Sequence, residues 1–273
     1  MRATVWHGKR DVRIDDVPDP AIQDDTDAVI RVTSSGLCGS DLHLYEVLTP
    51  FMTPGDVLGH EPMGVVEEVG PAVTDLRPGD RVVVPFRIAC GTCWMCRRGL
   101  RTQCETTQVT EHGMGARLFG CTELYGAVPG AQAEYLRVPQ AQYGPIKVPG
   151  GPPDDRFVCL SDVLPTAWQA VAYADVPRDG SLVVLGLGPI GAMACRIARH
   201  PGVAGGASAP WQQGAERSAV PAACLGRRGH PQPDGDQVRP RPTCRAARMR
   251  TTTRVVASRT RVPSASGASV GTV

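Results

Sequence analysis

The sequence predicts a two-domain α+β protein: a β-barrel or sandwich, then the first strand–helix unit of a parallel α/β domain, and finally a tail. Three observations lead to this prediction. From residue 1 to about 150, short apolar runs alternate with Gly and Pro, and no long amphipathic pattern interrupts them. Residues 151–203 follow the order helix, buried strand, glycine turn, helix. Residues 204–273 show neither the helical nor the strand period.

The barrel is predicted from strands that turn residues separate. Residues 28–32 and 64–70 are apolar runs typical of strands. The turn Pro78-Gly79-Asp80 leads into a third strand at 81–84. We therefore expect residues 1–150 to form one all-β domain.

A change of pattern after Gly150-Gly151-Pro152-Pro153 marks the second domain. We expect a helix over residues 162–174 with Pro165 in its first turn. A buried strand is expected over 181–185 and a further helix over 190–200. This order opens an α/β nucleotide-binding domain, which the sequence predicts to stop at about residue 203.

Charge separates the chain into two halves. Residues 1–200 carry 18 Lys and Arg against 24 Asp and Glu, a net charge of −6, whereas residues 201–273 carry 11 Arg and 3 acidic residues, a net of +8. Apart from Leu225, the basic part lacks Leu, Ile, Phe and Tyr, so we expect residues 204–273 to be disordered. A nucleic-acid arm would have this charge, but Trp211 is its only aromatic residue, and we expect no nucleic-acid partner.

The chain shows no sign of a membrane or secretory address. Its first ten residues have no apolar signal core, and the longest uncharged apolar stretch, residues 181–195, contains Gly and Pro and is too short to span a bilayer. We expect a cytoplasmic protein without membrane contact, in which thiols stay reduced.

The strongest chemical signal is a cluster of four cysteines within fifteen residues. The spacing Cys90-x2-Cys93-x2-Cys96-x7-Cys104 brings four soft donors into one loop, as tetrahedral zinc requires. Four thiolates leave no open position for a substrate. The sequence therefore predicts a structural zinc site, with four unrelated buried thiols as the alternative.

A second, dispersed set of candidate ligands precedes this loop. Cys38 follows a predicted strand and His60 lies about twenty residues later. A catalytic zinc needs a third ligand and an exchangeable position, so these two residues alone also fit an ordinary core.

The glycine motif Gly186-x-Gly188-Pro189-Ile190-Gly191 lies between the predicted strand and helix of the second domain. In that context, backbone N–H groups and a helix N-terminus bind the pyrophosphate of a dinucleotide. The acidic residue that holds the ribose should follow a second strand near residues 207–213, but neither an acid nor a predicted strand occurs there. The sequence therefore does not distinguish NAD from NADP as the cofactor.

Together these residues resemble the zinc-dependent medium-chain alcohol dehydrogenases over about residues 1–203. The match is carried by Gly59-His60-Glu61-x2-Gly64-x5-Gly70-x2-Val73, which fits the family's zinc signature. The resemblance implies a GroES-like domain at 1–150 and a Rossmann domain at 151–203. An acidic residue at 162 and the segment Gly130-Ala131-Gln132-Ala133-Glu134-Tyr135 look most like the formaldehyde-dehydrogenase-type branch.

The resemblance also implies roles for single residues. Cys38, His60 and Asp162 would bind a catalytic zinc, with Glu61 as an occasional ligand. Asp41 would orient His60, and Ser40 and His43 would carry the substrate proton to solvent. A final set would contact the nicotinamide cofactor: Thr166, Gly186, Gly188, Pro189, Ile190 and Gly191. Without the resemblance, Ser40, Thr166 and Asp162 would be read as helix caps and His43 as a surface histidine.

The implied function is hydride transfer between a small alcohol or aldehyde and NAD or NADP, with two zinc ions per chain in a homo-oligomer. Family members are longer than 273 residues, and the pattern is lost after residue 203. We therefore expect a truncated or frameshifted member with little or no turnover. The alternative is a zinc-stabilised barrel without activity.

Overall fold

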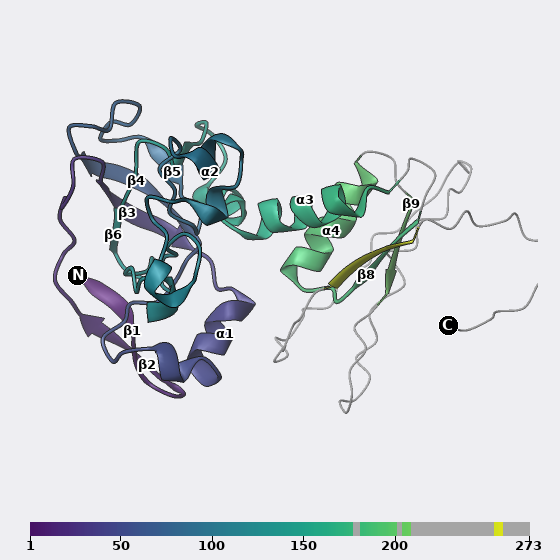
Figure 1. Cartoon of the computed structure of the whole chain (residues 1–273), viewed down its shortest axis with the longest axis horizontal. Helices are drawn as coiled ribbons and strands as arrows, with labels where there is room; N and C mark the ends of the chain where they lie inside the picture. The colour runs from purple at the N-terminus through teal and green to yellow at the C-terminus, as the bar shows by residue number, and fades with distance from the viewer. Residues whose placement is uncertain (177–180, 201–203, 209–253, 259–273) are drawn as a thin grey trace, which may run out of the picture. The chain divides into compact units, whose positions relative to one another are not determined.

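The computed structural model describes residues 1–176, 181–200, 204–208 and 254–258. The chain divides into two compact units, Met1–Pro165 and Thr166–Val273 (Figure 1). Each unit is described by itself below.

An antiparallel sheet with the strand order β6-β3-β4-β5-β7 forms the framework of the first unit. Its strands are β3 (Ala28–Ser35), β4 (Pro62–Val69), β5 (Arg81–Val83), β6 (Tyr135–Val138) and β7 (Ile146–Lys147). A hairpin of β1 (Arg2–Gly8) and β2 (Asp11–Asp16) joins this framework through single bridges from Ala3 to Ala133 and from Val5 to Val57. The three strands predicted from the sequence are confirmed within a few residues.

The core of this unit lies on one face of the sheet. Ile30, Val66, Val82 and Leu136 project from β3, β4, β5 and β6, and Phe119 joins them from a loop. All five are at most 2% exposed. Because alternate residues of a strand share a face, Ala28 and Ile30 of β3 reach the same core, while their neighbour Val29 is buried on the other face.

Helices in the first unit are short, and the two α-helices begin at cysteines of the predicted metal sites. They are α1 (Gly39–Glu46) and α2 (Trp94–Arg97), with 3₁₀ turns at Thr49–Phe51, Arg101–Gln103, Thr110–His112, Glu123–Tyr125, Asp154–Arg156 and Val158–Leu160. Cys38 is the N-cap residue of α1, and its backbone N–H donates to Asp41 Oδ2 at 2.8 Å in a capping box. The cap therefore fixes two of the predicted site residues beside each other.

In the second unit, α3 (Val163–Ala174), which begins at the end of the first, leads to β8 (Ser181–Leu185) and α4 (Pro189–Arg199). These elements confirm the predicted helix, strand and helix. Glycine at position 186 has φ of +92°, a left-handed conformation that allows the tight turn into α4. Pro189 occupies the first helical turn, where its missing N–H costs nothing.

Two strands of the second unit differ from the sequence expectation. β9 (Ala204–Ser208) pairs in parallel with β8, and β10 (Arg254–Ser258) pairs with it in antiparallel register, so β8 lies between them. We expected no strand after residue 203. The segment Ala-Gly-Gly-Ala-Ser of β9 contains only small residues, which carry no hydrophobic period to detect. The rest of the predicted disordered tail lies outside the described residues.

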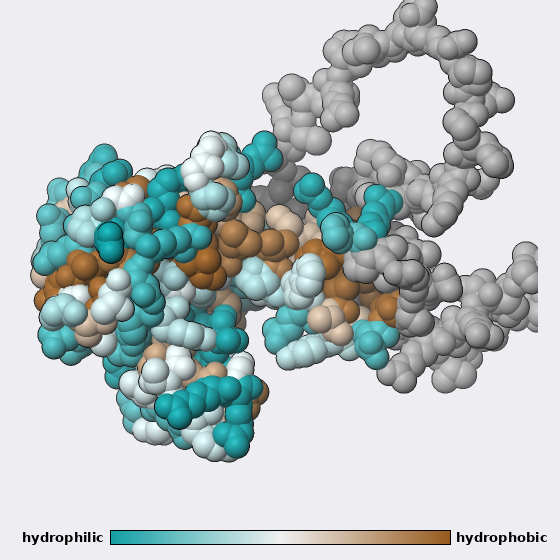
Figure 2. Space-filling model, turned by 90° about the horizontal axis from the view of Figure 1, so that it is seen from above, coloured by the Kyte–Doolittle hydropathy of each residue, from teal (hydrophilic) through white to brown (hydrophobic). Residues whose placement is uncertain are grey.

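The surface of the first unit is largely hydrophilic in the face that Figure 2 shows, with apolar residues in smaller areas between the polar ones. Across the described part of the chain, no helix combines the length and the apolar character needed to cross a membrane.

Arg81 and Asp154 connect β5 to the segment that ends the first unit. Arg81 donates to Asp154 and to the carbonyl oxygens of Pro149 and Pro152 at 3.0 and 2.8 Å, and Thr33 also donates to Asp154. Burial opposes ionisation of Asp154, but these hydrogen bonds outweigh it and lower the pKa of the carboxyl below its ordinary value. The ion pair should therefore stabilise the folded chain.

Asp154→Asn is expected to reduce the free energy of unfolding by about 1–2 kcal/mol near neutral pH. Since the folded-state pKa is the lower one, the contribution is present above the unfolded-state pKa and is lost as the pH falls through the folded value. Denaturant unfolding of wild type and variant from neutral pH to about pH 3 should show the two curves converging. Asp155→Asn, at the exposed neighbouring residue, is the control and should leave stability unchanged.

Candidate metal centres

The four cysteines predicted to bind zinc converge in the first unit. The sulfur atoms of Cys90, Cys93, Cys96 and Cys104 all lie within 4.8 Å of one another. Cys90, Cys96 and Cys104 are at most 4% exposed, and Cys93 begins α2 as its N-cap residue. The described cysteines form no disulfide, so the cluster consists of free thiols.

Hydrogen bonds in this loop favour the thiolate form that a metal needs. The Cys90 sulfur accepts from the N–H groups of Thr92 and Cys93 at 3.4 and 3.3 Å, and from the Thr106 hydroxyl at 3.2 Å. Burial opposes ionisation, but these donors lower the pKa of Cys90 to about 5. Burial, the thiol of Cys93 and the charge of Cys104 raise the pKa of Cys96 to about 12. Four converging thiols with such donors fit tetrahedral zinc, whose charge would favour the thiolate at all four.

A second cluster combines residues from distant parts of the first unit. Cys38 Sγ, one imidazole nitrogen of His60 and one carboxylate oxygen each of Glu61 and Asp162 lie within 4.8 Å of one another. The His60 Nε2 to Asp162 Oδ2 distance is 3.5 Å, and Cys38 Sγ lies 3.9 Å from the same oxygen. The structure thus brings together residues that 124 positions separate in the chain.

The charges of this second cluster fit a divalent cation. Burial disfavours the charged form of His60, but hydrogen bonds to Asp162, Asp41 and Cys38 raise the pKa of its imidazole to about 12. Burial and the charge of Asp162 raise the pKa of Glu61, whose buried Oε1 has no hydrogen-bond partner among the residues that the structure describes. One imidazole surrounded by a thiol and two carboxyl groups is a donor set that zinc accepts.

Residues around His60 set its position. Asp41 Oδ1 lies 3.4 Å from His60 Nδ1, the ring nitrogen that faces away from Asp162. Gln132 Nε2 reaches Asp41 Oδ2 at 3.5 Å, and the Phe86 ring meets the imidazole edge-on at 6.4 Å between centroids. The sequence alone predicts no role for Gln132 or Phe86. Only the fold brings these loops to His60, so no local sequence signal identifies them.

Glycines allow loops to approach the backbone before His60. A Cβ on Gly120 would lie 2.4 Å from the Gly59 carbonyl oxygen, and one on Gly130 would lie 2.3 Å from that of Leu58. Gly59 itself has φ of +100°. Gly59 of the zinc signature therefore supplies a left-handed turn, and Gly120 and Gly130 supply the room for their loops beside it.

Known proteins match this chain over its first unit and beyond. Residues 24–149 match the family model of the alcohol dehydrogenase GroES-like domain. The uncharacterized zinc-type alcohol dehydrogenase-like protein AdhB of Bacillus subtilis (strain 168) is 44% identical over 196 residues, which cover 71% of this chain and 51% of that protein. The glutathione-independent formaldehyde dehydrogenase of Pseudomonas aeruginosa is 36% identical over 213 residues, covering 74% and 52%. Among solved structures, alcohol dehydrogenase TADH from Thermus sp. ATN1 is 40% identical with a TM-score of 0.69, covering 77% and 57%.

The chain belongs to the zinc-type medium-chain alcohol dehydrogenase family. The resemblance and the fold class that the sequence predicted are thereby confirmed. This alcohol dehydrogenase-family chain spans about half the length of the relatives named above.

Two of the predicted proton-transfer residues lie on α1 of the dehydrogenase-family chain. Ser40 Oγ is 3.3 Å from His60 Nε2, which is also the ring nitrogen that faces Asp162. His43 is exposed on the same helix. The structure therefore places Ser40 at the metal cluster and His43 toward solvent, and their roles stay predictions.

The predicted cofactor residues all lie in the second unit. Gly186, Gly188 and Gly191 shape the turn and the first turn of α4, where Gly191 is buried against the sheet and Ile190 is half-buried. Thr166 lies in α3 and is half-buried. The glycine turn therefore leads directly into the N-terminus of α4, and its role in binding a pyrophosphate stays a prediction.

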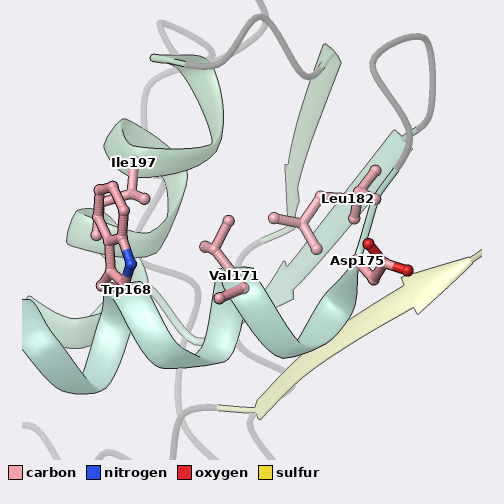
Figure 3. Close-up of a pocket in the computed structure, with 7 residues that line it drawn as sticks. Trp168, Val171, Asp175, Leu182 and Ile197 are labelled. Carbon is pink, nitrogen blue, oxygen red and sulfur yellow. The ribbon is translucent and has the colours of Figure 1, made fainter.

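The same unit contains a cavity of about 230 Å³ away from the glycine turn (Figure 3). It lies between α3, α4 and β8, and it is lined by Trp168, Val171, Ala172, Asp175, Val176, Leu182 and Ile197. No residue of the Gly186–Gly191 motif lines it. The cavity therefore contributes nothing to the predicted dinucleotide site.

Gly36→Ala is expected to weaken metal binding at the second cluster about tenfold or more. A Cβ at this position would lie 2.1 Å from Glu61 Oε2 and 2.9 Å from Glu61 Cβ, so the carboxylate must move away from Cys38 and His60. Competition with a chelator would measure the dissociation constant of the more weakly held zinc ion. Gly150→Ala, where a Cβ meets nothing within 4 Å, should bind zinc as the wild type does.

Proposed function

We propose that this chain carries a zinc-dependent alcohol or aldehyde oxidoreductase that transfers hydride between a small substrate and NAD or NADP. The observation that carries the proposal is the convergence of Cys38, His60, Glu61 and Asp162 within 4.8 Å, beside the Ser40 hydroxyl. The family supports the reaction class. The acidic residue at 162 and the formaldehyde dehydrogenase among the relatives favour small alcohols and hydrated aldehydes as substrates.

Two metal sites follow from the two clusters. Cys90, Cys93, Cys96 and Cys104 would hold a structural zinc, since four thiolates complete its coordination. Cys38, His60 and Asp162 would hold the catalytic zinc, with Glu61 near enough to join them. Bound there, zinc supplies a Lewis acid that polarises a substrate oxygen and lowers the pKa of its hydroxyl.

The proton of the substrate hydroxyl would leave through this chain's own residues. Ser40 Oγ lies at the cluster, 3.3 Å from His60 Nε2, and can accept a hydrogen bond from a substrate there while it donates onward. His43, three positions further along α1 and exposed, would pass the proton to water. Asp41, whose Oδ1 lies 3.4 Å from His60 Nδ1, would orient the His60 ring.

NAD or NADP would occupy the glycine turn of the second unit. The N–H groups at the start of α4 and the absence of side chains at Gly186 and Gly188 would let the pyrophosphate approach the backbone. The nicotinamide supplies the hydride acceptor. Thr166 and Ile190 are the residues that we propose to position its ring.

A reducing compartment fits these sites. All eight described cysteines are free thiols, including the four that lie together in one loop, where an oxidising environment would favour disulfides. We infer a cytoplasmic location, and we propose a homo-oligomer as in the family.

A single-turnover assay tests the function. The sequence predicts little or no turnover, and this assay detects even one reaction per chain. Zinc-loaded chain in excess over NAD or NADP is mixed with small primary alcohols or formaldehyde, and the absorbance of the reduced nicotinamide is followed. We expect reduction that falls at least about a thousandfold in His60→Ala. Absence of any His60-dependent reduction in a chain that holds two zinc ions would refute catalysis and favour a zinc-stabilised, non-catalytic protein.

A further inference from the structure

A second kind of binding site lies beside the four-cysteine loop. A cavity of about 340 Å³ in the first unit is lined by Pro85, Arg87, Ala89, Arg101, Tyr143, Gly144 and Ile146. Two arginines, Arg87 and Arg101, line this one cavity, and its lining includes no Asp or Glu. Its volume lies in the range of small-molecule sites.

The guanidinium of Arg87 has no counter-ion in this cavity. It is half-buried, and within the part of the chain that the structure describes it has neither a hydrogen-bond nor an ion-pair partner. Burial and the neighbouring charge of Arg101 lower the pKa of Arg87, while Tyr143 and Cys96 act in the opposite direction. A partly desolvated charge without a partner is costly, and an anion in the cavity would offset that cost.

Arg101 and Tyr143, which also line the cavity, hold each other in place. Arg101 Nε donates to the Tyr143 hydroxyl, and its guanidinium lies 5.7 Å from the centre of the Tyr143 ring. The ring in turn packs on Gly91, where a Cβ would lie 2.3 Å from Tyr143 Cδ2. The cysteine loop therefore fixes the ring, and the ring leaves the other donors of Arg101 free for a ligand.

We infer that this cavity binds a small organic oxyanion, a carboxylate or a phosphate monoester, between Arg87 and Arg101. The planar forks of the two guanidiniums match the oxygen atoms of such groups. The carbon body would lie against the Tyr143 ring, Pro85 and Ile146. This site is separate from the Cys38 and His60 cluster and does not depend on the proposed dehydrogenase activity.

Isothermal titration calorimetry on the zinc-loaded full chain tests the inference with benzoate, phenyl phosphate and inorganic phosphate, and with benzyl alcohol as the uncharged counterpart. We expect at least one anion to bind, more weakly as salt rises. Whichever of benzoate and phenyl phosphate has the lower dissociation constant shows whether the site prefers a carboxylate or a phosphate monoester. Binding should persist in Cys38→Ala, which excludes an anion held at the catalytic metal.

Four variants decide which residues bind the anion. Arg87→Gln and Arg101→Gln should each weaken it about tenfold or more. Arg98→Gln is the matched control, because Arg98 lies on the same loop but stacks on Trp94 at 3.7 Å instead of facing the cavity. Arg87→Lys, which keeps the charge, covers the case in which the glutamine variant fails to fold, and it should bind with intermediate affinity.

Two results would overturn the inference. One is that no anion binds the wild type; loss of the structural zinc in Arg87→Gln would then show that Arg87 only balances the charge of the cysteine thiolates near it. The other is that the anion affinity of Arg87→Gln and of Arg101→Gln equals that of the wild type.

Discussion

Replacing Cys104 by Ser is expected to remove one of two zinc ions per chain and to lower the melting temperature by roughly 10 °C. Cys104 is fully buried, and its sulfur also accepts the backbone N–H of Cys90 at 3.3 Å. The hydroxyl of serine reaches less far and does not ionise at neutral pH, so the tetrahedral site loses a ligand.

The size of this effect follows from how little else holds the loop. Its buried cluster consists of the cysteines with Ala89 and Ala116, which bury little apolar surface. Structural zinc supplies roughly 10–16 kcal/mol to small zinc-binding peptides. We expect Cys104→Ser to lower the free energy of unfolding by about 4 kcal/mol, a modest part of that amount. Each kcal/mol moves the melting temperature of a unit of this size by about 2–4 °C, which gives roughly 10 °C.

Elemental analysis and thermal unfolding measure the two parts of this prediction. Cys159→Ser is the control, since Cys159 is a half-buried free thiol of the same unit that belongs to neither cluster. It should keep both zinc ions and the melting temperature. If Cys104→Ser kept two zinc ions, the four-cysteine loop would not be a metal site.

The sequence predicts the structural site better than the catalytic one, because its four ligands lie in one short loop. Cys90 to Cys104 need only local turns to converge, and their spacing alone describes the cluster. Asp162 is different. It meets Cys38 and His60 only because the last segment of the first unit, just before α3, lies beside residues 124 positions earlier in the chain. The residues alone did not distinguish a ligand from a helix cap there.

Strand prediction fails where side chains carry no pattern. β3 and β4 were predicted because each contains a run of apolar, mostly β-branched residues. β9, which pairs in parallel with β8, was missed because the sequence Ala-Gly-Gly-Ala-Ser carries no hydrophobic period. Arg87, Arg101 and Tyr143 show the same limit for sites, since only the fold brings these distant positions to one cavity.

Cys38→Ala should abolish zinc binding at the second cluster, while the structural zinc stays in place. The thiol is one of four donors within 4.8 Å, and no other cysteine among the described residues belongs to that set. Removing it takes the thiolate out of the cluster and leaves an imidazole and two carboxyl groups, a set that holds zinc much more weakly. We expect one zinc per chain and loss of at least about a thousandfold in any hydride transfer.

Cys121 provides a matched comparison for this variant. Its thiol is half-buried, and the charge of the His60 imidazole acts on it. Burial raises the pKa of this thiol, which is not among the four donors of the cluster. Cys121→Ala should therefore retain two zinc ions. Equal zinc loss in both variants would mean that the region responds to packing and not to a missing ligand. Retention of two zinc ions in Cys38→Ala would remove Cys38 from the catalytic site, because a thiolate ligand cannot be dispensable for a metal that it holds.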